Sequence, residues 1–310
     1  QARGAEVCVL IDGIGGGYFG SRVYHRLHRA GIPVGRFMHS ALPWRMPFLN
    51  LRTHKKLLIV DGCIAFTGGL NIADGNRVAL NPPHPIRDTH FRLDGPVVEQ
   101  LTMAFASDWA FAMGGDLDGP RWFPPLAPAG GITARAVTSG PDADVEKIEF
   151  VVLEALACAR HSVRLVTPYF LPGELVINAL QLAAIRGVTV DVIIPRRSDH
   201  RFVNWATRAH IDPLLKSGVR IWLDEPPFDH SKALVVDGEW CFVGSANWDT
   251  RSFRLNFELN VEIYDTNLAR DLDHFMRGKM ETRLMREDLK ARALPVRLRD
   301  AGVRLLLPYL

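Results

Sequence analysis

Two histidines and two lysines occupy matching places in two copies of one sequence motif. The first copy begins at His54 and reads HKKLLIVDG, and the second begins at His230 and reads HSKALVVDG. Each continues into a matching tail, FTGGLN ending at Asn71 and FVGSAN ending at Asn247, so the histidine-to-asparagine distance is 17 residues in both. One HxKxxxxD stretch could be accidental, but two copies with a similar apolar run between the lysine and the aspartate and with the same tail indicate an internal repeat.

A histidine beside a lysine, supplied twice, suits chemistry on a phosphodiester. A neutral imidazole attacks phosphorus, and a second, protonated imidazole delivers a proton to the departing alkoxide. Lys56 and Lys232 would stabilise the negative charge that builds on the phosphoryl oxygens. The sequence contains no CxxC, HExxH or Asp-rich loop, so we expect neither a metal nor a cofactor.

The apolar filling of each copy predicts a β-hairpin. Short runs rich in β-branched residues, 57–60 and 233–236, are each ended by Asp-Gly and followed by a second run, 64–67 and 240–243. Asp-Gly favours a type I′ turn, which needs positive φ at both central residues. Alternate residues of a strand share a face, so each histidine and its lysine point the same way. Asp61 and Asp237 lie an odd number of positions from their histidines, and we interpret both as positioning residues.

The doubled motif resembles the phospholipase D superfamily, and the residues around it are similar to its bacterial cardiolipin synthases. The stretches that carry this resemblance span nearly the whole chain and are residues 50–57, 66–73, 87–91, 244–253 and 255–262. The resemblance implies an enzyme that joins two phosphatidylglycerol molecules into cardiolipin through a phosphatidyl-histidine intermediate and releases glycerol. It also implies a membrane surface as partner, no nucleic acid, and the bacterial cytoplasmic membrane as the location of the intact protein.

On this basis we expect an α/β fold of two similar repeats with mixed sheets, related by a pseudo-twofold axis, with the active site at their interface. His54 is our candidate nucleophile and His230 our candidate general acid, although the reverse assignment stays open because the residue types are identical. Asn71 and Asn247 are candidate phosphate donors, and Ser245 is a candidate supporting residue. The family places a histidine-orienting carboxylate on the strand after the hairpin, where the best matches are Asp88 and Glu258. Which carboxylate serves which histidine stays open.

The predicted domains are a first repeat at 1–116, a Pro- and Gly-rich linker at 117–131, and a second repeat at 132–310. The strand predicted at 3–12 matches one at 186–195, which follows a helix near 145–159, a strand near 162–167 and a helix near 174–185. The first repeat has nothing before its matching strand. We therefore expect it to lack its opening strand and helix and the chain to be part of a longer protein; a degenerate first repeat is the alternative.

Other features are less informative. The net charge of +3 suits an anionic lipid or a polynucleotide and decides between neither, and no apolar run reaches the roughly 18 residues of a membrane span. The stretch 15–20 spells GxGxxG, but no acidic residue ends the next strand, so we do not expect a dinucleotide site. A loop inserted at about 38–48 could line an acyl-chain groove or simply cover the core. The stretch 294–310 could lie on an anionic membrane or cap the domain.

We also expect one helix at 18–30 and another at 202–217, a strand at 87–93, buried free cysteines and an exposed Glu262. Of the remaining histidines, His90 could enter the site, whereas helical ones such as His210 are expected at the surface.

Three other functions remain open. A hydrolytic phospholipase D would use water as the acceptor, and a nuclease would require a stronger basic patch with stacking aromatic side chains. A non-catalytic lipid- or phosphate-binding module would be expected to carry a damaged motif, whereas both copies here are intact.

Overall fold

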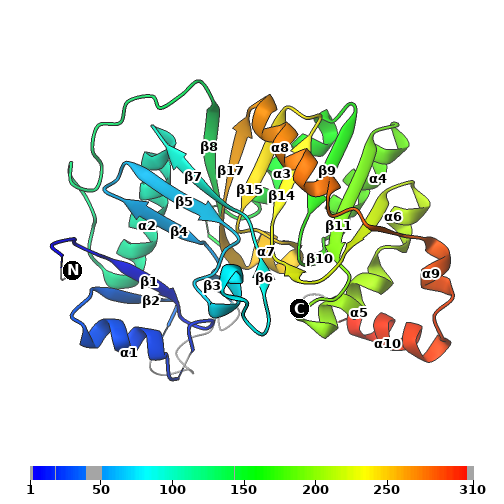
Figure 1. Ribbon diagram of the computed structural model, residues 1–310, viewed down its shortest axis with the longest axis horizontal. Helices are drawn as coiled ribbons and strands as arrows, with labels where there is room; N and C mark the ends of the chain where they lie inside the picture. The colour runs from blue at the N-terminus through cyan, green and yellow to red at the C-terminus, as the bar shows by residue number, and fades with distance from the viewer. Residues whose placement is uncertain (1–2, 18, 40–50, 143, 306–310) are drawn as a thin grey trace.

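The computed structural model describes residues 3–17, 19–39, 51–142 and 144–305. The chain forms two α/β halves that lie side by side, the first at the left of Figure 1 and the second at the right. Most of the predicted inserted loop at 38–48, the predicted helix start at Tyr18 and the last five residues lie outside the described residues.

The second half is built on a mixed nine-stranded sheet in the order β18-β12-β11-β9-β14-β15-β17-β3, with β8 also pairing with β17. The strands β9, β11 and β12 run parallel, whereas β14 runs antiparallel to β9 and β15, and β17 runs antiparallel to β15 and β8 but parallel to β3. Runs of Val, Ile and Leu suit these central strands because helices cover both faces of the sheet. The strands are β3 (Arg52–Thr53), β8 (Thr133–Ser139), β9 (Ser162–Val166), β11 (Thr189–Pro195), β12 (Arg220–Asp224), β14 (Ala233–Val236), β15 (Trp240–Gly244), β17 (Asn256–Tyr264) and β18 (Thr282–Leu284).

Two clusters of buried residues form the core. One packs α3 and α4 against the sheet and includes Ile148, Leu180 and Val192. The other joins the halves, because Leu101 of α2 and Leu272 of α8 belong to the same cluster as residues of β14, β15 and β17. The helices are α1 (Arg22–Arg29), α2 (Val97–Met113), α3 (Lys147–Cys158), α4 (Glu174–Ile185), α5 (Arg201–His210), α6 (Asp212–Lys216), α7 (Thr250–Arg254), α8 (Thr266–Arg277), α9 (Arg286–Lys290) and α10 (Leu294–Arg304).

The first half contains a three-stranded antiparallel sheet, β4-β5-β7, and a parallel pair, β1-β2. β14 lies between β9 and β15, whereas its counterpart β4 pairs only with β5 among the described residues. No described strand of the first half takes the place that β9 takes in the second. The remaining strands are β1 (Val9–Asp12), β2 (Val34–Phe37), β4 (Leu57–Val60), β5 (Ile64–Gly68), β6 (Ile86–Arg87), β7 (His90–Asp94), β10 (Phe170–Leu171), β13 (Phe228–Asp229) and β16 (Trp248–Asp249).

Both predicted hairpins are confirmed. β4 pairs antiparallel with β5, and β14 pairs with β15 in the same way. Asp61 and Gly62 have φ of 52° and 64°, and Asp237 and Gly238 have 53° and 69°. These positive values are those that a type I′ turn requires, which explains why each run stops at Asp-Gly.

Three predictions about elements are wrong. The helix expected at 202–217 is two helices, α5 and α6, because Pro213 at the start of α6 has no N–H to continue the first. The helix expected from residue 18 is α1, which begins at Arg22 after Ser21, whose side chain accepts the N–H of Tyr24. The strand expected at 87–93 is interrupted between β6 and β7.

Several burial predictions are also wrong. Glu262 is buried and its carboxylate lies 2.7 Å from Arg135 Nε across the sheet. His210 is buried, because its Nε2 can donate to the Pro172 carbonyl at 2.8 Å. Cys63 and Cys158 are exposed, although Cys241 is buried as expected. Among the described residues, no helix is both long and apolar enough to cross a bilayer.

Candidate active site

Short parallel strand pairs between the halves position the two motifs. β3, just before His54, pairs with the start of β17, and the His54 N–H donates to the Phe257 carbonyl at 2.8 Å. β13, just before His230, pairs with β6, and the His230 N–H donates to the Arg87 carbonyl at 2.7 Å. Each histidine therefore follows a strand that is bound to the other half of the chain.

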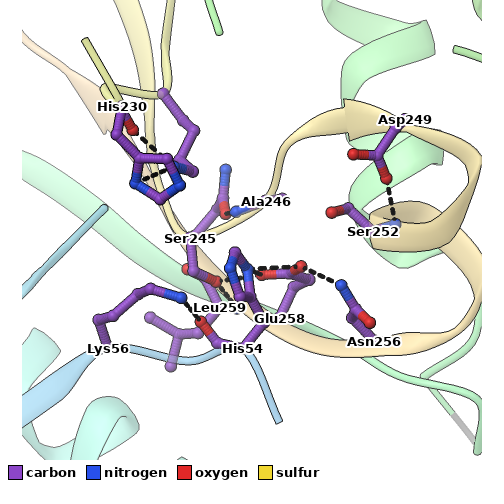
Figure 2. A network of polar contacts seen from close by, with 12 residues as sticks. His54, Lys56, His230, Ser245, Ala246, Asp249, Ser252, Asn256, Glu258 and Leu259 are labelled. Carbon is purple, nitrogen blue, oxygen red and sulfur yellow. Dashed lines mark hydrogen bonds and ion pairs between the residues drawn. The ribbon is translucent and has the colours of Figure 1, made fainter. Parts of the chain in front are cut away.

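The same pairing places each histidine beside a carboxylate of the opposite half. His54 Nδ1 lies 3.0 Å from both oxygens of Glu258, and Figure 2 shows the two side chains facing each other. His230 Nδ1 lies 2.9 Å from Oδ2 of Asp88. The geometry thus resolves the question that the sequence left open: the carboxylates are exchanged crosswise between the repeats. An imidazole that donates Nδ1–H to a carboxylate keeps Nε2 free for chemistry.

Glu258 is fully buried and is held by three donors. Besides His54, it accepts from the Ser245 hydroxyl at 2.5 Å and from Asn256 Nδ2 at 3.1 Å. Burial alone would raise the pKa of Glu258, but His54, the nearby charge of Lys56 and the Ser245 hydroxyl lower it to about 2. The carboxylate is therefore ionised throughout the physiological range.

The two lysines lie against their own histidines. Lys56 Nζ donates to the His54 carbonyl at 2.7 Å. Lys232 Nζ donates to the His230 carbonyl at 2.5 Å and lies 2.9 and 3.1 Å from the two ring nitrogens. Burial lowers the pKa of Lys56 to about 7 and that of Lys232 to about 8, and their mutual repulsion contributes at Lys56. Figure 2 shows His54, Lys56 and His230 in one close view.

The two imidazoles favour the neutral form. Burial lowers the pKa of His54 to about 4, although Glu258 opposes the shift. Burial and the charges of Lys232 and Lys56 lower the pKa of His230 well below its ordinary value. Burial raises the pKa of Asp88 to about 6 against the pull of Lys232. An anion bound between these groups would raise the pKa of every base near it, because it stabilises their charged forms.

The aspartates of the two motifs lie apart from this cluster. The Asp237 carboxylate accepts the backbone N–H groups of Arg160, His161 and Ser162 at 2.7–2.9 Å and so fixes the chain that enters β9. Although burial opposes the effect, these bonds hold the pKa of Asp237 below its usual range. Asp61 is exposed, and among the described residues its side chain has no such donors. The bonds of Asp237 agree with a positioning role, whereas nothing in the placement of Asp61 supports the same role for it.

The remaining candidates differ in their placement. Ser245 belongs to the site through Glu258. Asn247 is buried, and its Oδ1 has no partner among the described residues. Asn71, its counterpart in the first repeat, is exposed and forms no side-chain hydrogen bond with the described residues. His90 is also exposed, and partial desolvation lowers the pKa of its imidazole against the opposing charge of Asp88.

Two groups at the site were missed by sequence reasoning. The Tyr169 ring lies edge-on to the His230 ring at 6.0 Å, and its hydroxyl donates to Asp199 at 2.8 Å. Lys279 is buried and lies 2.5 Å from Asp229, which also accepts the Ser231 N–H at 2.8 Å. Tyr169 follows a buried strand and a Thr-Pro pair, and this position at a strand end could have marked it as a candidate site residue. The sequence around Lys279 contains no comparable signal. Among the described residues, no three His, Cys, Asp or Glu side chains are grouped as a metal ion would require.

Comparisons with known proteins give one consistent picture of what the chain is similar to. The family model described as "Cardiolipin synthase, PLD-like domain" matches residues 152–279. The major cardiolipin synthase ClsA of Bacillus subtilis is 37% identical over 99% of this chain and 65% of its own length. Cardiolipin synthase 2 of Staphylococcus epidermidis is 35% identical over 99% of this chain and 64% of its own length. The chain thus spans slightly less than two thirds of the relatives it matches.

Among solved structures, the phosphatidylserine synthase of Haemophilus influenzae superposes with a TM-score of 0.65 at 14% identity, covering 94% of this chain and 78% of that one. At this identity the likeness concerns the fold alone. Residues 152–279 thus match the PLD-like domain of cardiolipin synthases, and the chain, with its doubled motif, is similar over almost its full length to the bacterial cardiolipin synthases.

Proposed function

We propose that this chain carries the catalytic site of a phosphatidyltransferase that joins two phosphatidylglycerol molecules into cardiolipin and glycerol. The observation that supports this best is the crosswise arrangement of His54 with Glu258 and His230 with Asp88, with one buried lysine beside each histidine. The relatives named cardiolipin synthase supply the substrate class. The reaction takes place at a membrane surface, because both substrates and the product are lipids.

In the first step, Nε2 of neutral His54 attacks the phosphorus of one phosphatidylglycerol. A P–N bond forms and the P–O bond to the glycerol head breaks, while protonated His230 gives its proton to the departing glycerol oxygen. Lys56 and Lys232 stabilise the phosphoryl oxygens. Glu258 balances the positive charge that forms on the His54 ring, and this favours His54 as the nucleophile.

In the second step, His230, now neutral, takes the proton from a terminal hydroxyl of the second phosphatidylglycerol. That oxygen attacks phosphorus, the P–N bond to His54 breaks, and cardiolipin leaves. His230 is protonated again, so the cycle closes without any further reactant. The phosphodiester anion supports this proton cycle, since its charge opposes the effect of burial on the pKa of His230.

Thin-layer chromatography of products from radiolabelled phosphatidylglycerol tests the reaction type. We expect cardiolipin and free glycerol in equal amounts. Phosphatidic acid without cardiolipin would identify a hydrolase of the phospholipase D kind. His54→Ala is the control for the site and should abolish either product.

Trapping of the intermediate tests the assignment of the two histidines. The reaction is stopped with denaturant at alkaline pH, which preserves phosphohistidine, and the labelled peptide is mapped. We expect label on His54, and more of it in His230→Ala when the donor has a good leaving group that needs no proton. Label on His230 in the unsubstituted chain would reverse the roles.

A further inference from the structure

Helix α10 carries an exposed apolar stripe. Leu294 and Leu298 are each 63% exposed and Leu305, which follows the helix, is 81% exposed. With Ala301 they recur at intervals of three and four residues, so they share one face of the helix. Isolated exposed leucines are ordinary, but a row of them along a helix indicates a surface that binds a membrane or another molecule.

The opposite side of α10 is anchored, so the stripe is held outward. Asp300 is buried and pairs with Arg292 at 2.5 Å and with Arg299 at 2.7 Å. The Arg299 guanidinium lies 3.9 Å from the centre of the Trp205 ring on α5. The predicted capping role of this stretch is therefore present for the described residues, and it leaves the leucine face free for the other predicted role.

The charge around the stripe is positive. Arg297 and Arg304 flank it on one side and are exposed, whereas the helix's one acidic residue, Asp300, is buried and neutralised. α5 beneath it adds the exposed Arg201 and has no acidic residue. An apolar face bordered by arginines matches the interface of an anionic bilayer, where leucines enter the acyl boundary and cations meet the head groups.

This surface is continuous with the candidate site. Asp199 and His200 immediately precede α5, and Tyr169 contacts both of them and the His230 ring. The charge of Asp199 also acts on His230. Phe202, in the first turn of α5, is 57% exposed and lies edge-on to Trp205, the ring that Arg299 covers. Figure 1 shows α5 and α10 at the same lower edge as β3 and β6.

We propose that the leucine stripe of α10, with Phe202 and the flanking arginines, docks this chain on an anionic phospholipid bilayer beside the active site. The docked bilayer would present lipid head groups to His230 while the acyl chains stay in the membrane. The inference rests on the proposed function for the identity of the lipid substrate. The docking itself is measured without catalysis.

Vesicle co-sedimentation of the chain tests the proposal with Leu294→Ser/Leu298→Ser. The matched control is Leu175→Ser/Leu182→Ser on α4, at the upper right of Figure 1, where both leucines are similarly exposed at 53% and 57%. We expect the α10 pair to lower affinity for phosphatidylglycerol vesicles about tenfold or more and the α4 pair to leave it unchanged. Circular dichroism checks that each variant is folded.

A charge variant gives a second, independent measurement. Arg297→Gln/Arg304→Gln should weaken binding to phosphatidylglycerol vesicles, and added salt should reduce the difference. Binding to phosphatidylcholine vesicles should be weak for every variant. Equal affinity of the unsubstituted chain for both lipids, an unchanged α10 pair, or an equal loss in the α4 pair would overturn the docking surface.

Turnover of a monomeric short-chain phosphatidylglycerol separates the two proposals. We expect the α10 pair to process this soluble substrate at the rate of the unsubstituted chain, because docking is not needed. If no variant turns it over but vesicle binding still depends on the leucine stripe, the docking stands and the proposed function fails. A loss of soluble turnover in the α10 pair alone would overturn the docking interpretation.

Discussion

Glu258→Gln tests the crosswise pairing most directly. The carboxylate accepts from His54 Nδ1, the Ser245 hydroxyl and Asn256 Nδ2. A glutamine amide has one oxygen and one NH2 group, so it must turn N–H groups toward at least one of these donors. Where the NH2 group meets the His54 ring, Nδ1 becomes the acceptor and the proton moves to Nε2, which removes the attacking lone pair.

The size of the effect follows from the same geometry. In a Ser-His-Asp triad, replacement of the orienting aspartate by its amide lowers kcat about 10⁴-fold through the wrong tautomer, or roughly 5 kcal/mol in the barrier. Glu258 is fully buried and its pKa is about 2, so the carboxylate is ionised and no bulk water is in contact with it to compensate for the loss of its charge. We expect a loss of about 10³- to 10⁴-fold in the rate of intermediate formation with little change in KM.

Single-turnover kinetics with radiolabelled phosphatidylglycerol measure this step, and ¹⁵N NMR of the histidine rings reports the tautomer. Asp88→Asn is the matched control, because it removes the same charge beside the other imidazole. We expect it to leave the His54 tautomer unchanged and to slow proton transfer to glycerol. The crosswise pairing is refuted if Glu258→Gln alters the tautomer of His230 while that of His54 stays the same.

Three further outcomes are expected. Burial holds the pKa of Lys56 at about 7 and that of Lys232 at about 8, so both lysines lose their positive charge as pH rises through roughly 7–8. We therefore expect kcat/KM for a soluble phosphodiester to fall over this range, and a constant kcat/KM up to about pH 10 would contradict this. Gly244→Ala would place a Cβ 2.5 Å from the Asn260 Cα, so urea denaturation should show a loss of about 1–3 kcal/mol, and unchanged stability would contradict the close approach of β15 to β17. Asp237→Asn should cost about 1–2 kcal/mol of stability, whereas Asp61→Asn should be neutral; an equal effect on stability would refute the difference in their bonding.

The local parts of the site could be predicted from the sequence. An Asp-Gly pair needs only its neighbours to form a type I′ turn, and both hairpins form as expected. The placement of each lysine two residues after its histidine is equally local. Burial was predicted less well, because Glu262 and His210 are paired with partners far away in the chain.

The crosswise exchange could not be predicted, because it depends on very short and very distant pairings. β3 and β13 are two residues long and show no periodicity. His54 and Glu258 are 204 positions apart, and His230 and Asp88 are 142 apart. The sequence therefore left open which carboxylate serves which histidine. Only the packing of the two halves decides it.

The exchange also creates an asymmetry that argues for a division of roles. Ser245 supports Glu258 through its hydroxyl, but the matching position in the first repeat is Gly69. A Cβ there would lie 2.9 Å from Cγ of Asp88, so no side chain fits beside the shorter carboxylate. Against burial, the charges of His54 and Lys56 and then the Ser245 hydroxyl lower the pKa of Glu258 to about 2, whereas burial raises that of Asp88 to about 6 against the pull of Lys232.

These two carboxylates suit different tasks. The partner of the nucleophile must stay ionised while the His54 ring carries a positive charge through the lifetime of a phosphohistidine. The partner of the general acid only has to orient a ring that gains and loses a proton in each step. A strongly ionised Glu258 meets the first demand, whereas Asp88 meets the second. We infer that the two identical motifs differ in role because the carboxylates that face them differ. Ser245→Gly removes the hydroxyl that donates to Glu258, so it should lower the rate of intermediate formation more than the rate of its breakdown. Rapid-quench measurement of the two steps tests this.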